Sequence, residues 1–138
     1  MTKVYNNITH SFINAFNGLR LAVSERNMKI HICIAVITVI LAAIVKLSPV
    51  EWAVILLTTA GVFAAETFNT AIENLSDKVC PTYDNTIKIV KDLAAGAVLI
   101  MAISAIIVGL LIFIPKIITL ITCPVSYTHL TLPTSDLV

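Results

Sequence analysis

Apolar residues dominate three blocks of the chain, and each block is long enough to cross a lipid bilayer. A transmembrane helix needs about 20 mainly apolar residues, and the blocks reach that length when their flanks are included. They predict transmembrane helices over residues 28–47, 50–72 and 92–114. Because the turn at residues 47–49 is so short, the first two helices are expected to be antiparallel neighbours. The pattern predicts an all-α integral membrane protein.

A different pattern precedes the first block, within residues 1–27. Phe12, Phe16, Leu19 and Val23 recur three or four positions apart, which places them on one face of a helix. A helix that is apolar on one side only is typical of a segment lying in the membrane interface. We therefore predict an N-terminal amphipathic surface helix here, with a solvated arm as the alternative.

The end of the chain, residues 122–138, departs from both patterns. It is polar, it has no hydrophobic period, and it reads like translated sequencing-adapter sequence. We predict that it is a non-native tail, and we leave His129 and Asp136 out of the candidate site. Residues 28–121 then form the predicted three-helix transmembrane domain.

Composition and charge agree with this organisation. Hydrophobic residues make up 58% and charged residues 12% of the chain, whereas a soluble domain carries about 25% charged residues. Lysine and arginine favour one side of the spans: Lys3, Arg20, Arg26, Lys29, Lys78, Lys88 and Lys91 against Lys46 and Lys116. Cytoplasmic segments carry such an excess. The asymmetry predicts that the N-terminus and the second connection are cytoplasmic, and no basic patch indicates a nucleic-acid partner.

Four polar residues follow one another along the second predicted helix as it nears the cytoplasm. Glu66, Asn69, Glu73 and Asp77 fall within an arc of about 80° and extend over about 16 Å of helix. A carboxylate inside a membrane is costly unless it faces protein or water, and it is therefore a functional candidate. A solvated helix end explains Asp77 alone, but it does not explain a polar face three turns long.

The other two helices also begin with polar residues at this side of the membrane. The first cluster contains Glu25, Arg26, Lys29 and His31, and the second contains Lys88, Lys91 and Asp92. Carboxylates hold Mg²⁺, which bridges to substrate phosphates, and lysine neutralises phosphate charge. The three ends together predict a magnesium–phosphate site. No glycine-rich nucleotide-binding loop is present, so spacing alone gives little support to nucleotide binding.

Small residues four apart, such as Ala60 with Ala64 and Gly61 with Ala65, predict close helix packing. Three short helices enclose a polar site poorly. We therefore expect an oligomer in which subunits share the site.

Three motifs carry a resemblance to a known family. They are "ExxNTAIExxxD" from Glu66 to Asp77, "KDLAAGAVLI" from Lys91, and "FNGLRLAVSERN" before the first span. Over residues 11–114 the chain resembles the prokaryotic diacylglycerol kinase family. The resemblance implies a trimeric membrane kinase with three spans and an N-terminal surface helix. It also implies transfer of the γ-phosphate of MgATP to a lipid alcohol at the cytoplasmic face.

The resemblance also assigns roles to individual residues. It implies that Glu66 is the catalytic base and that Glu25 and Glu73 bind the metal. The implied ATP-binding residues are Glu25, Glu73, Thr82, Tyr83, Asp84, Lys91 and Asp92. The implied substrate-binding residues are Glu66, Asn69 and Arg20. Asp84 departs from the family pattern, which often has histidine there, and Val90 replaces the usual alanine.

The lipid alcohol is the open question. The stretch "ERNMKIH" resembles the branch whose members phosphorylate undecaprenol to undecaprenyl phosphate, whereas the diacylglycerol branch tends to have an acid where His31 stands. The alternatives are a diacylglycerol kinase that makes phosphatidic acid and, from another class, a small proton-coupled transporter. A transporter needs an acid near mid-membrane with paths to both sides. The stripe from Glu66 to the lysine-rich surface favours phosphoryl transfer.

Overall fold

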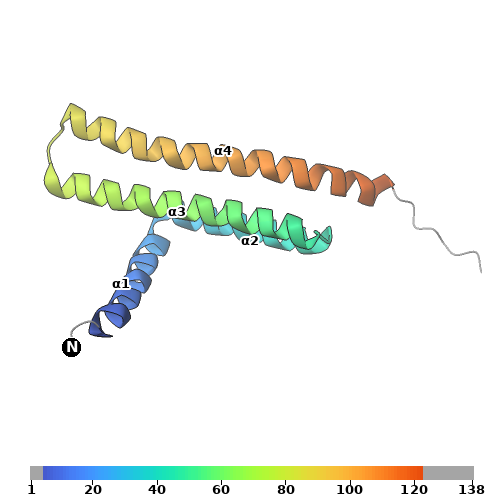
Figure 1. Ribbon diagram of the computed structural model, residues 1–138. Coiled ribbons are helices and arrows are strands. Elements are labelled where there is room, and N and C mark those ends of the chain that lie inside the picture. The colour runs from blue at the N-terminus through green and yellow to red at the C-terminus, as the bar shows by residue number, and fades with distance from the viewer. Residues whose placement is uncertain (1–4, 123–138) are drawn as a thin grey trace, which may run out of the picture.

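The computed structural model describes residues 5–122, which form four α-helices (Figure 1). They are α1 (Tyr5–Ser24), α2 (Arg26–Ile44), α3 (Pro49–Val79) and α4 (Asn85–Thr122). By length and composition, α2, α3 and α4 are each able to cross a membrane. The prediction of an all-helical chain with three spans is confirmed over the described residues. The predicted non-native tail lies outside them, apart from Thr122.

The long helices α3 and α4 form an antiparallel pair, and α2 lies beside α3 (Figure 1). The first two spans are therefore antiparallel neighbours, as their short connection predicts. At 19 residues, α2 is much shorter than α3 with 31, so it begins level with the middle of α3. At that level α1 turns away from the other helices. The ends of α3 and α4 that are joined by the second connection extend beyond the start of α2.

The helices continue past the apolar blocks that predict the spans. The second block ends at residue 72, yet α3 runs to Val79; the third begins at residue 92, yet α4 begins at Asn85. Hydropathy measures only whether a segment tolerates lipid, whereas a helix in water or in protein needs only its backbone hydrogen bonds. The extra turns carry part of the predicted site, including Glu73, Asp77 and Lys91.

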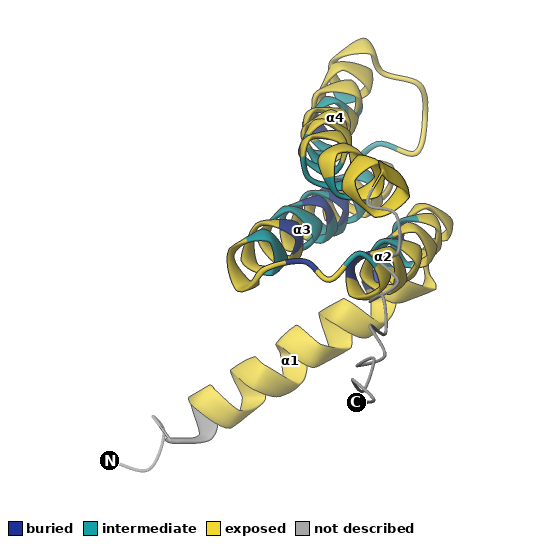
Figure 2. Ribbon diagram, turned by 90° about the vertical axis from the view of Figure 1, so that its right-hand side faces the viewer, coloured by how far each residue is buried: buried dark blue, intermediate teal, exposed yellow. Residues whose placement is uncertain are grey.

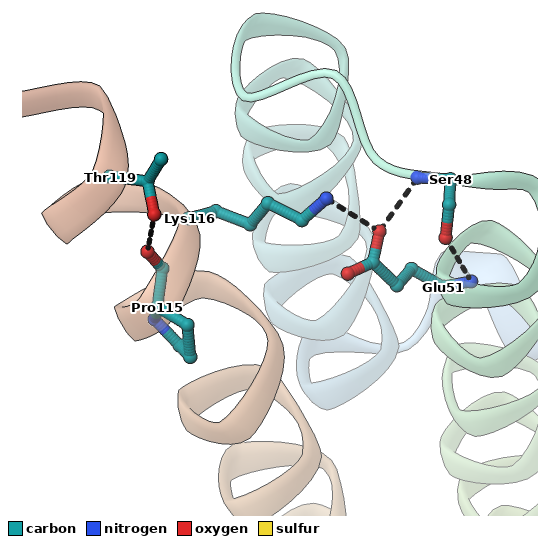
Figure 3. Close-up of polar contacts among 5 residues, drawn as sticks. All are labelled: Ser48, Glu51, Pro115, Lys116 and Thr119. Carbon is teal, nitrogen blue, oxygen red and sulfur yellow. Dashed lines mark hydrogen bonds and ion pairs between the residues drawn. The ribbon is translucent and has the colours of Figure 1, made fainter. Parts of the chain in front are cut away.

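The turn between α2 and α3 is closed by specific contacts. Lys46 adopts a left-handed backbone conformation with φ 55°, which ends α2. Ser48 and Glu51 then form a capping box: the Ser48 hydroxyl accepts from the Glu51 N–H, and the Glu51 carboxylate accepts from the Ser48 N–H. The same carboxylate pairs with Lys116 Nζ of α4 at 3.0 Å (Figure 3). The turn thereby connects all three spans.

Few of the described side chains are buried, and half of the buried residues lie on α3 (Figure 2). Ala42, Leu47 and Ile55 form a small core cluster at the α2–α3 turn, against which Trp52 packs. Gly61 lets the Met101 side chain of α4 lie against the α3 backbone, because a Cβ there would meet Met101 Cε at 2.3 Å. Most large apolar side chains remain exposed, which fits helices whose surroundings are lipid or other subunits.

Candidate active site

A polar cavity of about 200 Å³ lies where the start of α2 meets the second half of α3. It is lined by Glu25, Arg26, Asn27, Glu66, Thr70 and Glu73. Three of the predicted site carboxylates are thus brought together, with one guanidinium beside them. The cavity is the point at which two separate predicted clusters meet.

Local helix geometry positions the α3 side of the cavity. Glu66, Thr70 and Glu73 are spaced four and three residues apart, so they lie on one face of the helix. Burial decreases along this face: Glu66 is 2% exposed, Glu73 is half-buried and Asp77 is exposed. The predicted polar stripe therefore lies on one uninterrupted helix and runs from a buried carboxylate to a solvated one.

The opposite wall of the cavity comes from the junction of α1 and α2. Glu25 is the N-cap residue of α2, but its side chain makes no capping hydrogen bond. A capping carboxylate would be committed to backbone N–H groups; this one is available to the cavity. Arg26 and Asn27 follow it in the first turn of the helix.

The predicted substrate-binding residues are only partly assembled within one chain. Glu66 lines the cavity, whereas Arg20 is exposed on α1 and does not line it. Asn69 is 4% exposed and faces the packed side of α3. Its Oδ1 atom has no hydrogen-bond partner among the residues that the structure describes.

The predicted ATP-binding residues of the second connection lie outside the cavity. Lys91 Nζ pairs with Asp77 Oδ1 at 2.8 Å, and Asp92 pairs with Lys88 one turn earlier on α4. Asp84 Oδ1 accepts hydrogen bonds from the N–H groups of Thr86 and Ile87 at 2.8 and 3.0 Å. Asp84 therefore caps α4.

The adjoining loop residues Thr82 and Tyr83 are exposed, and Tyr83 is 81% exposed. Lys91 connects this region to the cavity, because its partner Asp77 lies one turn beyond Glu73 on α3. The predicted ATP-binding residues of the loop and α4 are therefore linked to the cavity-lining face of α3 through Asp77, but none of these loop and α4 residues lines the cavity.

The donor set can be compared with what a metal requires. Among residues 5–122, no group of three His, Cys, Asp or Glu side chains is close enough to hold a metal ion. Mg²⁺, however, is usually bound by one or two carboxylates, with water and substrate phosphates completing its shell. Glu25 and Glu73 line the same cavity, so the chemistry of the site fits Mg²⁺ bound together with a nucleotide.

Sequence reasoning missed two residues of the cavity, Asn27 and Thr70, and did not single out the buried Ser76. Thr70 had a detectable signal, because it lies four residues after Glu66 on the polar face. Asn27 had none, because only the position of α2 against α3 brings it to the cavity.

Comparison with known proteins identifies the family. The family model described as prokaryotic diacylglycerol kinase matches residues 13–113. The chain belongs to the prokaryotic diacylglycerol kinase family. With its three apolar helices, this family member is a multi-pass membrane protein. Every cavity residue lies inside the matched region.

Two curated relatives of this kinase-family chain cover most of its length. It is 40% identical over 113 residues to the undecaprenol kinase of Bacillus subtilis (strain 168), covering 81% of this chain and 92% of that protein. It is 38% identical over 120 residues to the diacylglycerol kinase of Synechocystis sp. (strain ATCC 27184 / PCC 6803 / Kazusa), covering 86% of this chain and 69% of that protein. No solved structure gives a significant match. Both relatives are kinases, which favours the kinase prediction over the transporter.

Proposed function

We propose that the protein is an integral membrane lipid kinase that transfers the γ-phosphate of ATP to undecaprenol, giving undecaprenyl phosphate. The observation that carries the proposal is the convergence of Glu25, Glu66 and Glu73 on one polar cavity. Similarity to the Bacillus undecaprenol kinase supports undecaprenol as the acceptor. Diacylglycerol is the second candidate, because the Synechocystis relative is a diacylglycerol kinase of similar identity.

In this proposal Glu66 is the general base. Its carboxylate accepts the proton of the lipid hydroxyl, the hydroxyl oxygen forms a bond to the γ-phosphorus, and the bond from that phosphorus to ADP breaks. The burial of Glu66 beside a polar cavity suits this role, because the acceptor hydroxyl reaches it from the membrane side. Arg26, which lines the same cavity, is placed to stabilise charge on the transferring group.

Glu25 and Glu73 would hold Mg²⁺ together with ATP. Bound there, the ion supplies positive charge that neutralises the phosphate oxygens. The ATP-binding role extends to Lys91 and Asp92 and to the loop residues Thr82, Tyr83 and Asp84. Asn69 and Arg20 complete the proposed contacts to the lipid.

The proposed assembly is a homotrimer with shared sites, placed with its active sites at the cytoplasmic face of the cell membrane. The separation of the cavity from the ATP-side residues within one chain supports sharing. The lysine and arginine asymmetry supports the orientation. We place α1 in the membrane interface because its apolar residues, among them Phe12 and Phe16, are exposed.

The test is a direct assay of the purified chain in lipid, with ATP, Mg²⁺ and either undecaprenol or diacylglycerol. We expect phosphate transfer to undecaprenol, and we expect Glu66→Gln to lower kcat by at least about 100-fold, the usual contribution of a general base. We expect Glu66→Gln to keep the oligomer size and the helical content of the unmodified protein. Transfer to neither lipid refutes the kinase proposal, and near-normal turnover of Glu66→Gln refutes the base assignment.

A further inference from the structure

A second cavity, of about 390 Å³, lies between α2, α3 and α4. We call it the apolar groove; it is lined by aliphatic and aromatic side chains and by threonines. Two of these threonines, Thr38 and Thr58, donate their hydroxyls to carbonyls of their own helices, Ile34 O and Val54 O. Their donor capacity is thereby used within the helix, which leaves the groove apolar over most of its length.

His31 is the exception in this lining. Among the described residues that line the groove it is the only ionisable one, and it is half-buried. An imidazole ring carries two nitrogens, and when neutral it offers one donor and one acceptor. No hydrogen bond or ion pair engages His31 anywhere in residues 5–122. A half-buried polar group without a partner among the described residues is suited to contact a ligand.

The polar cavity and the apolar groove meet at His31. On α2, Asn27 lines the polar cavity and His31 lines the groove four residues later. On α3, Glu66 lines the polar cavity and Val62 lines the groove four residues earlier. Residues four apart lie one turn apart on the same helix face. The two cavities therefore follow one another along two neighbouring helices, polar at one turn and apolar at the next.

This succession matches an amphiphile whose polar head lies near Glu66 and whose hydrocarbon chain follows the groove. The groove reaches from His31 to Leu41 along α2, a length of about 15 Å at 1.5 Å per residue. Resting on the proposed lipid kinase function, we infer that His31 determines acceptor specificity. Its imidazole hydrogen-bonds the hydroxyl oxygen of the acceptor, which in undecaprenol is the only oxygen and joins the hydrocarbon chain directly.

The experiment compares lipid and nucleotide kinetics in three variants of the full chain. His31→Leu removes the hydrogen bond, His31→Gln keeps a donor and an acceptor, and Cys33→Ala is a matched control. Cys33 lies on α2 two residues away, is exposed, and lines neither cavity. KM and kcat are measured for undecaprenol, for diacylglycerol and for ATP in vesicles of constant composition.

We expect His31→Leu to raise the KM of the preferred lipid about tenfold, which corresponds to about 1.4 kcal/mol, and to leave the KM of ATP unchanged. In the same variant, the ratio of kcat/KM for the preferred lipid to kcat/KM for the other lipid becomes smaller. His31→Gln recovers most of the lipid affinity, and Cys33→Ala behaves as the unmodified protein does.

Two results overturn the inference while the unmodified chain remains an active kinase. One is an unchanged lipid KM in His31→Leu. The other is a change in oligomeric state, with the KM values of lipid and ATP rising together; the groove then accommodates a second copy of the chain. Failure of the unmodified chain to phosphorylate either lipid refutes the proposed function instead.

Discussion

At the scale of single residues, Asn69 stands out because its buried side chain lowers the stability of the fold. It is buried on α3, and its side-chain oxygen has no partner among the described residues. A buried polar atom in that state costs on the order of 1–3 kcal/mol. We therefore expect Asn69→Leu to keep or raise the thermal midpoint, because leucine has the same number and branching of side-chain heavy atoms and no polar atom. If Asn69 binds substrate, turnover falls in the same variant.

Thermal unfolding in detergent micelles and the kinase assay measure the two effects separately. Val62→Ala provides the control, since Val62 is buried about two turns away on the same helix and its truncation leaves a cavity. That variant is expected to lose stability. A lower midpoint for Asn69→Leu than for the unmodified chain contradicts the expectation and assigns Asn69 a structural role.

At the scale of elements, ion pairs connect α3 and α4 near both ends of α3. Lys116 pairs with Glu51 at 3.0 Å, and Lys91 pairs with Asp77 at 2.8 Å. The two pairs differ in their surroundings. Glu51 also accepts the Ser48 N–H at 2.7 Å in the capping box, whereas Asp77 makes only an exposed contact. The α3–α4 contact at Glu51 is therefore the more stable of the two. At the other end, the exposed Lys91 side chain is able to leave Asp77 for another acceptor.

The difference predicts a rank order of stabilities. Glu51→Ala removes the capping-box contact and the ion pair, so it lowers the thermal midpoint more than Lys116→Met, which removes the ion pair alone. Lys46→Met, on the same turn but without an ion pair in the described chain, leaves the midpoint unchanged. Equal losses for Glu51→Ala and Lys116→Met contradict the capping contribution.

Turnover provides a second readout for these variants. Glu51 lies 15 residues before Glu66 on α3, about 22 Å along the helix axis. All three variants are therefore expected to keep the KM for ATP. A raised KM for ATP in Glu51→Ala shows that the far end of the helix pair influences the active site.

At the scale of the whole molecule, the parts of the site that one helix positions were predictable, and the parts that tertiary contacts position were less so. Glu66 and Glu73 share a face because the helical repeat places them there. The approach of Glu25 depends on where the short α2 begins along α3. Hydropathy does not predict the pairing of Lys91 with Asp77 either, since both lie in polar turns beyond the predicted second and third spans.

The same contacts leave the site incomplete in one chain, and this predicts complementation between subunits. Glu66→Gln and Lys91→Met are each expected to inactivate the protein. If each site takes Glu66 from one subunit and Lys91 from another, a mixed oligomer contains some sites with both native residues. In those sites the Lys91→Met subunit supplies Glu66 and the Glu66→Gln subunit supplies Lys91. We expect mixtures assembled together to regain activity above the sum of the separate variants, measured as phosphate transfer after joint reconstitution.

The control pairs Glu66→Gln with Glu73→Gln. Both residues line one cavity of one chain, so every site in a mixed oligomer carries one of the two defects and no activity returns. Recovery in this control means that the cavity itself is divided between subunits. Absence of recovery with Lys91→Met, after mixed oligomers are verified by differential tagging, means that each chain supplies Lys91 to its own cavity. The exposed Lys91–Asp77 pair would then have to open so that Lys91 turns toward Glu73 when ATP binds.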